Sequence, residues 1–149
     1  MIVSATRLRL RSWRHAPGFA RYIAASLGQA LTAAGFVDGR LLAGQRLTFW
    51  TVTRWCSEDA MRRWRPAGAH GRAMPFLVEW CDEASAARWE QRDGTAFPIW
   101  EDCAERMAGE GRASRVRQPS DAQAAGAAPG PPPKRGRRLV LPLRRSGRG

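Results

Sequence analysis

The first part of the chain alternates between apolar and polar residues and then changes to a helical period. Residues 2–11 (IVSATRLRLR) place small or apolar side chains on one face of an extended chain and arginines on the other. This alternation predicts a β-strand with one face partly in solvent. Over residues 18–34 apolar side chains recur every fourth position, which predicts an amphipathic helix with Pro17 near its start and Gly35 at its end.

Two strands are predicted next, over residues 36–43 and 46–55, with a turn at Gly44 between them. The second of these (RLTFWTVTRW) has β-branched and aromatic residues at both odd and even positions. A strand that is apolar on both sides is buried on both sides. We therefore expect it to need cover above and below the sheet.

A pair of short helices is predicted to follow. Ser57 has the side chain of an N-cap, and two acidic residues after it suit the positive end of a helix dipole over residues 60–64. A second helix is expected over about 67–77, with Pro75 kinking or ending it. The centre of residues 78–90 is expected to be a strand, although its alanine-rich part also suits a helix.

The last predicted elements are a helix from Pro98 through Met107 and a short strand over 113–120. The main order is strand, helix, strand, strand, helix, strand, which is the split βαβ arrangement of a ferredoxin-like α+β fold with an antiparallel sheet. Its helices cover one face only. A second copy covering the other face would give a homodimeric α/β barrel, so we expect a homodimer.

Composition divides the chain into two regions. Residues 1–118 hold 18 arginines and 12 acidic residues, whereas 119–149 hold seven basic residues and one acid and are rich in Ala, Gly and Pro. The second region has too few apolar residues to offset the entropy of ordering its backbone. We predict a folded domain over 1–118 and a disordered basic C-terminal tail over 119–149.

The basic tail admits three interpretations: contact with nucleic-acid phosphates, contact with an anionic membrane surface, or a solubilising extension. No recognition helix or zinc finger accompanies it, so we expect no specific nucleic-acid binding. No apolar stretch approaches the length of a bilayer span, and none resembles a signal peptide. Three widely spaced cysteines make no zinc motif and suit reduced thiols, which favours a cytoplasmic protein.

Four sequence stretches carry a resemblance to a known family. They are GFVDGRLL (35–42), TFWTVTRWCSEDAMRRW (48–64), GAHGRAMP (68–75) and EWCDEASAARWE (79–90). Together they resemble the dimeric α/β-barrel superfamily, and within it an uncharacterised bacterial branch of the antibiotic biosynthesis monooxygenase-like group. The superfamily includes cofactor-free oxygenases, haem-degrading enzymes and proteins without known chemistry, so the fold does not fix the function.

The resemblance implies a pocket and some of its residues. Oxygenases of the group are similar in having a tryptophan on the third strand and a histidine on the second helix, which here correspond to Trp50 or Trp55 and to His70. We expect His70 and Trp50 to be catalytic. Ser4 and Thr6 stand where a haem-degrading relative would have an asparagine. We expect the substrate to be bound by Thr6, Phe49, Trp55 and Met74.

The function that follows is a monooxygenase-like oxidoreductase acting on a hydrophobic aromatic small molecule. Without a nicotinamide or flavin motif, oxygen would be activated by the substrate anion or by bound haem, so the cofactor is either none or haem. His70 is then a general base or an axial haem ligand, and no other metal is expected. The alternative is a non-catalytic ligand-binding or interaction module, in which side chains fill the pocket and His70 turns outward.

Arginines add a further possibility for binding. The stripe on the first strand (Arg7, Arg9 and Arg11) and the cluster Arg62, Arg63 and Arg65 are either solvated surfaces or sites for an acidic ligand. Seven tryptophans suit a ring-lined apolar pocket, but core packing explains most of them equally well.

Overall fold

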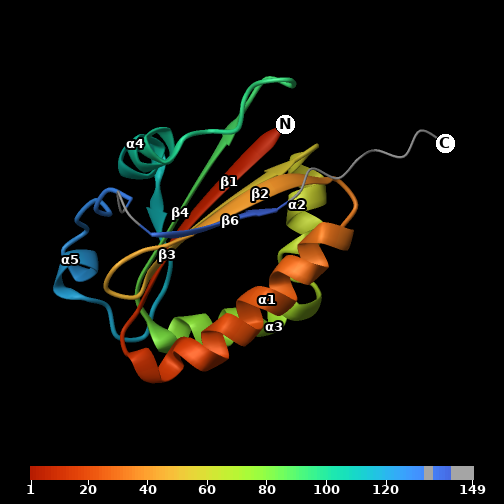
Figure 1. Cartoon of the computed structure of the whole chain (residues 1–149). Coiled ribbons are helices and arrows are strands. Elements are labelled where there is room, and N and C mark those ends of the chain that lie inside the picture. Colours follow the sequence, from red (N-terminus) through yellow and green to blue (C-terminus); the bar gives the residue numbers. More distant parts are fainter. Residues whose placement is uncertain (133–135, 142–149) are drawn as a thin grey trace.

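The computed structural model describes residues 1–132 and 136–141. In these residues, six strands form one antiparallel sheet in the order β5-β4-β1-β3-β2-β6 (Figure 1). The strands are β1 Ile2–Leu10, β2 Phe36–Ala43, β3 Thr48–Trp55, β4 Cys81–Glu90, β5 Arg112–Ala113 and β6 Arg137–Leu141. The helices are η1 Trp13–His15, α1 Ala16–Thr32, α2 Glu58–Trp64, α3 Gly68–Trp80, α4 Trp100–Glu110 and α5 Asp121–Ala124.

The central four strands confirm the ferredoxin-like α+β fold, and most predicted elements are found close to their expected bounds. Ser57 caps α2 as expected, because its side chain accepts a hydrogen bond from the backbone N–H of Ala60. The helix expected over about 67–77 does not end at Pro75, because α3 continues to Trp80. The strand expected in the centre of residues 78–90 is confirmed, and its alanine-rich part, which also suited a helix, is strand.

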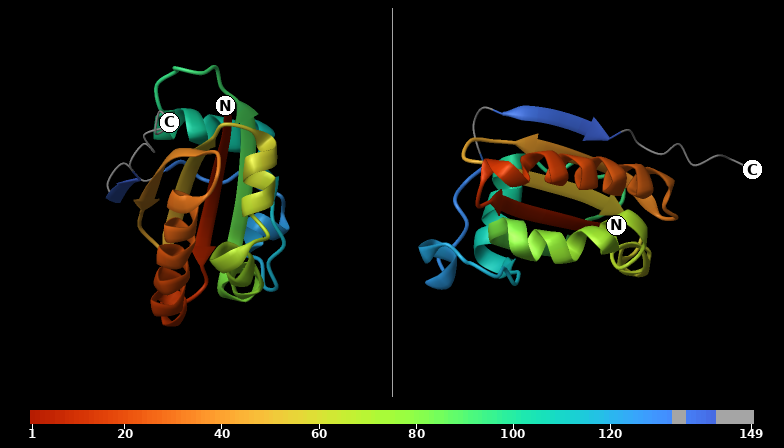
Figure 2. Two further views of the ribbon diagram at one scale, coloured as in Figure 1. Left: turned by 90° about the vertical axis from the view of Figure 1, so that its right-hand side faces the viewer. Right: turned by 90° about the horizontal axis from the view of Figure 1, so that it is seen from below.

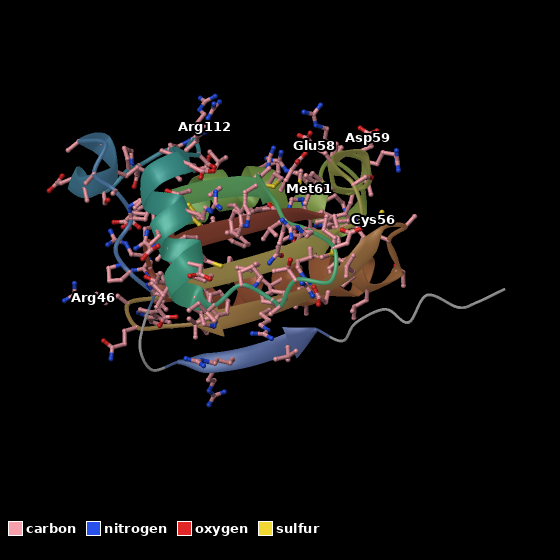
Figure 3. All side chains as sticks on the ribbon, turned by 90° about the horizontal axis from the view of Figure 1, so that it is seen from above. Arg46, Cys56, Glu58, Asp59, Met61 and Arg112 are labelled. Carbon is pink, nitrogen blue, oxygen red and sulfur yellow. The ribbon has the colours of Figure 1, made fainter. Side chains whose placement is uncertain are left out.

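Helices lie on both faces of the sheet. α1 and α3 run side by side across one face (Figure 2), and α4 lies across the opposite face (Figure 3). The expectation that helices cover only one face was therefore wrong. The two faces are called here the α1/α3 face and the α4 face.

The α4 face carries the bulky part of the core. Val3, Trp50 and Val52 are fully buried there against Trp100 and Met107 of α4. This contact supplies the second cover that β3 needs. The argument for a homodimer from an uncovered sheet face was thus wrong, because the same chain covers it.

Phe97 holds the segment between β4 and α4 on the α4 face, where it packs against the core. Its ring lies between two guanidinium groups, at 4.2 Å from Arg40 and 5.0 Å from Arg54. Arg54 is itself buried and donates through Nε to Asp38 at 2.6 Å. Removing either partner of such a buried ion pair strongly destabilises the folded protein, because the other charge stays buried without a partner.

Two of the three stripe arginines, Arg7 and Arg9, are paired with acids, whereas Arg11 is exposed. Arg7 is buried and donates to Glu83 at 2.6 Å, and Arg9 makes two hydrogen bonds of 2.8 Å to Asp82. Both acids come from β4, which pairs with β1 along this edge. Acids of the neighbouring strand therefore neutralise these two arginines, which leaves them unavailable as an anion site.

The C-terminal region begins as part of the domain. Ser120 donates to Glu83 at 2.9 Å, and Gln123 accepts from the backbone N–H of Ala84 at 2.7 Å and donates to the carbonyl of Ser114. These bonds give the Ala84 N–H of β4 a partner where no described strand supplies one, and the Glu83 carboxylate a further one. Residues 120–124 of the tail expected from residue 119 are therefore docked on β4.

Farther along, Arg137–Leu141 pairs with β2 as the edge strand β6. The remaining residues of the expected tail, 133–135 and 142–149, lie outside the described residues. No helix in the described part of the chain is long and apolar enough to cross a membrane.

The docked segment predicts an effect of truncation. A chain ending at residue 118 should be less stable than a chain ending at residue 132 by about 1–3 kcal/mol, because the N–H of Ala84 and the Glu83 carboxylate lose partners. Urea unfolding followed by circular dichroism measures the difference. In the full chain, Gln123→Ala should reproduce much of it and Gln118→Ala, at an exposed site, should not. Equal stability of the two truncated chains would contradict the docking.

Candidate functional site

A cavity of about 150 Å³ lies between the α1/α3 face of the sheet and the two helices. Its floor is built from small residues of three neighbouring strands, because β4, β1 and β3 bring Ala86, Thr6 and Thr51 into one row. Large side chains in this row would fill the space. The cavity thus follows directly from which residues are small.

The floor changes in character along the strands. The row at the α2 end of the sheet contains Arg88, Ser4 and Thr53, whereas the row at the other end has Ala84 and Leu8. Figure 3 shows these two ends of the sheet: Met61 of α2 lies at one, and Arg46 of the β2–β3 turn at the other. The cavity therefore has a polar end under α2 and a mainly apolar end, roofed by Phe19, Ile23 and Leu77, with Ser114 and Arg115 at its edge. These are called here the polar end and the apolar end.

His70 lies at the polar end, in the first turn of α3, and is half-buried. Its ring packs on Trp64 with the two centroids 4.1 Å apart. Its Nδ1 lies 2.7 Å from the carbonyl oxygen of Arg65. A carbonyl only accepts, so the ring must donate through Nδ1–H, which leaves the lone pair on Nε2.

Gln29 of α1 holds this end of the roof in place. Its side-chain oxygen accepts the backbone N–H of His70 at 3.0 Å, and its amide nitrogen donates to the carbonyl of Ala67 at 3.0 Å. The chain comes close to it at Gly68, where φ is +54° and an added Cβ would lie 2.7 Å from the Gln29 oxygen. The junction of α2 and α3 is thereby fixed to α1.

The environment keeps the His70 ring neutral. Burial lowers the pKa of His70 below its ordinary 6.5, the hydrogen bond to the Arg65 carbonyl opposes this, and the Arg65 charge lowers it further. A neutral imidazole with a free Nε2 is the form that can accept a proton. At neutral pH this residue has the protonation state of a general base.

Other polar groups at the site divide into satisfied and unsatisfied ones. Thr53 accepts from the Trp55 indole at 3.0 Å, so its hydroxyl has a structural partner. Within residues 1–132 and 136–141, the hydroxyls of Ser4, Thr6 and Thr51 have no hydrogen-bond partner. Three free hydroxyls therefore face the cavity and are available to a ligand.

Four of the residues expected at the site do meet there. Thr6, Trp55, His70 and Met74 all line the cavity. No observation tests their roles, which stay predictions. The open cavity and the half-buried His70 differ from the filled pocket and outward-turned histidine that the binding-module alternative required.

Trp50 and Phe49 are placed elsewhere. Trp50 is fully buried on the α4 face, on the other side of the sheet from His70. Phe49 is on the α1/α3 face but packs against Phe19 at 4.6 Å, next to the apolar end, without lining the cavity. The expectation that Trp50 faces the pocket is corrected, and Trp55 is the third-strand tryptophan that does.

Some lining residues were not expected. Ala84, Ala86 and Arg88 share one face of β4, a pattern that alternation would have revealed once the segment was taken as a strand. Tyr22 and Ser26 reach the cavity from α1. Nothing in the sequence around Tyr22 and Ser26 distinguishes them from other residues of the helix, so only the structure shows that they line the cavity.

The cysteines have no part in the site. Burial raises the pKa of Cys81 and of Cys103 to about 12, so both thiols stay protonated. Cys56 is exposed and does not line the cavity. In the described residues, no group of three or more His, Cys, Asp or Glu side chains is arranged to hold a metal ion.

Comparison with solved structures gives several matches to this arrangement of sheet and helices. SnoaB of Streptomyces nogalater, a cofactor-independent oxygenase crystallised as a point mutant, is 16% identical with a TM-score of 0.53, covering 66% of this chain and 97% of SnoaB. A candidate antibiotic biosynthesis monooxygenase from Nitrosomonas europaea is 9% identical with a TM-score of 0.53, covering 61% of this chain and 98% of its own. This chain has the antibiotic biosynthesis monooxygenase fold.

A conserved protein from Methanosarcina mazei Go1 has the same fold, at 13% identity and a TM-score of 0.55 over 61% of this chain and 92% of its own. No protein-family model and no curated protein matches the sequence. The resemblance seen in the sequence is thus confirmed for the fold. At these identities, activity has to be argued from the cavity itself.

Haem does not fit the cavity as it stands. Pockets for drug-sized ligands typically enclose about 300–1,000 Å³, and a porphyrin is no smaller than such ligands. The 150 Å³ between the sheet and α1/α3 is about half of the lower bound. Seating a macrocycle would require α1 and α3 to separate, which would break the Gln29 bonds to residues 67–70.

The geometry around His70 predicts its titration. Its NMR midpoint should lie below 6.5 with the proton on Nδ1, since burial disfavours the charged ring and the Arg65 carbonyl fixes the tautomer. The NMR signals of the only other histidine in the sequence, His15, are identified by their loss in His15→Gln. Gln29→Ala should expose the ring and move the midpoint up toward 6.5. A midpoint above 6.5, or a proton on Nε2, would contradict this arrangement.

Proposed function

We propose that this protein is a cofactor-independent oxygenase of a hydrophobic aromatic small molecule, with His70 as the general base. The observation that carries the proposal is a neutral imidazole at the polar end of the cavity, whose Nε2 has no partner among the described residues. The fold shared with a cofactor-independent oxygenase supports the same choice. The size of the cavity favours one or two rings inside it, with the rest of the ligand at its open side.

The proposed chemistry needs little from the protein beyond positioning and one proton transfer. His70 Nε2 removes a proton from an acidic C–H or O–H of the substrate, and the resulting anion supplies the electrons that reduce O₂. For a methylene between aromatic rings the balance is R₂CH₂ + O₂ giving R₂C=O + H₂O. One oxygen atom enters the product, and the other leaves as water with the two hydrogens.

The remaining groups act on the anion. The free hydroxyls of Ser4, Thr6 and Thr51 are hydrogen-bond donors at the floor, where negative charge on a substrate oxygen would develop. Trp55 and Met74 contribute apolar surface for the rings. Trp50 has no direct role in this proposal, because the sheet separates it from the substrate.

Oxygen uptake with a model substrate tests the proposal. Anthrone has a methylene acidified by two rings and a carbonyl, so the protein should accelerate its conversion to anthraquinone without added cofactor. His70→Gln should lower the rate about 10²-fold or more, and His15→Gln should leave it unchanged. Because the pKa of His70 is lowered, the rate should stay constant near pH 7 and fall only on acidification below 6.5.

Chemistry at this cavity also predicts an effect of filling it. Ala86→Leu places a larger side chain on the floor and should abolish turnover while leaving the fold intact, as judged by circular dichroism. Oxygen uptake that persists in Ala86→Leu, or in His70→Gln, would contradict the proposed site.

We also propose a homodimer, but one that forms through the edge of the sheet and not through its α4 face. The α4 face is occupied within one chain, whereas the edge strand β6 exposes Leu139 and Val140. An exposed apolar edge is a surface that a second chain can pair with. Sedimentation velocity at several concentrations tests it: a dimer that persists on dilution supports the proposal, and a monomer throughout opposes it.

A further inference from the structure

The cavity has an uncompensated positive charge. Arg65, Arg88 and Arg115 line it together with His70, and no described Asp or Glu does. Elsewhere in the domain buried arginines are matched by acids, as Arg7 is by Glu83. Unlike Arg7, the three cavity arginines are exposed, and none of them forms an ion pair with any described residue.

Arg65 and Arg88 reach the polar end from different elements. Arg65 follows the last residue of α2 and Arg88 is near the end of β4, in register with Ser4. Both side chains are exposed while also lining the cavity, so they form its rim. Desolvation, followed by the charge of Arg88, lowers the pKa of Arg65, so the two cations are close enough to repel. A bound anion would remove that repulsion.

A buried donor lies at the same end. Trp64 Nε1 is buried and has no hydrogen-bond partner among the described residues, although Trp64 lines the cavity beside His70. A buried N–H without an acceptor is destabilising, and native proteins rarely leave one. The Trp64 indole N–H and the Ser4 hydroxyl both border the polar end, where they could donate to an oxygen of the ligand.

We propose that the ligand is an aromatic carboxylate, bound with its rings at the apolar end and its carboxylate between Arg65 and Arg88. The floor gradient from Leu8 to Arg88 matches such a molecule in polarity from end to end. The inference rests on the proposed function for its choice of cavity, but not for any oxygen chemistry. It specifies which substrates the cavity selects.

Calorimetric titration of the full chain with 2-naphthoate and with 2-naphthamide tests the proposal, because the two share their rings and differ in charge. Naphthoate should bind at least about fivefold more tightly, as expected for charge-assisted contacts at a partly exposed rim. Its advantage should shrink as NaCl is raised, because salt screens exposed charges.

Three variants locate the charge. Arg65→Gln and Arg88→Gln should each remove most of the preference for naphthoate and leave naphthamide binding unchanged, whereas Arg88→Lys should retain part of the preference. Arg115→Gln is the matched control, because Arg115 follows Ser114 at the other end of the cavity, beside Ala84. His70 donates to the backbone carbonyl of Arg65, so this hydrogen bond survives the side-chain substitution.

The outcomes separate the two proposals. Equal affinity for naphthoate and naphthamide, or a preference lost in Arg115→Gln but kept in the Arg65 and Arg88 variants, would overturn the carboxylate site and leave the oxygenase proposal standing. Binding of neither compound would overturn the carboxylate site and would also count against the oxygenase proposal, since both require a cavity that accepts aromatic rings.

Discussion

The packing of Trp50 against α4 is the contact on which the rest of the molecule depends. It places the large side chains of the central strands on one face, where Val3, Val52 and Trp100 complete a solid core. The opposite face is then free to carry threonine, serine and alanine without loss of the main core. These small residues offer little apolar surface for α1 and α3 to pack on. The space that they leave under the two helices is the cavity.

The α1/α3 face has to be held open as well as left empty. Apolar packing at one end, with Phe19 on Phe49, and the Gln29 hydrogen bonds at the other fix α1 over the sheet. The same Gln29 bonds set the start of α3 and so the position of His70. One polar side chain on α1 therefore couples the shape of the cavity to the placement of the His70 imidazole.

Much of the fold could be predicted from the sequence because the element signals are local. Alternation in residues 2–11, the four-residue period of 18–34 and the N-cap at Ser57 each depend on a few neighbouring residues. The faces were harder, because β3 is apolar on both sides and its pattern does not tell which side holds the cavity. Parity was informative, however: Trp50 and Trp55 are separated by an odd number of positions and so lie on opposite faces of a regular strand.

The errors beyond that came from long-range contacts. The cover on the second face came from α4, which begins at Trp100, far along the chain from the end of β3 at Trp55. The arginines of β1 were neutralised by acids of β4. Neither contact leaves a mark in local periodicity. The composition of residues 119–132 indicated a tail, but the side chains of Ser120 and Gln123 hold part of it against β4.

The central claim is that an aromatic ring enters the space between the small-residue floor and α1/α3. Methyl NMR of alanine-labelled protein titrated with p-cresol tests it most directly, because neighbouring alanines of the sheet face opposite sides. The account predicts shifts of the Ala84 and Ala86 methyl signals, which line the cavity, with Ala5 and Ala87 under α4 unchanged. Shifts confined to Ala5 and Ala87, or none at all, would contradict it.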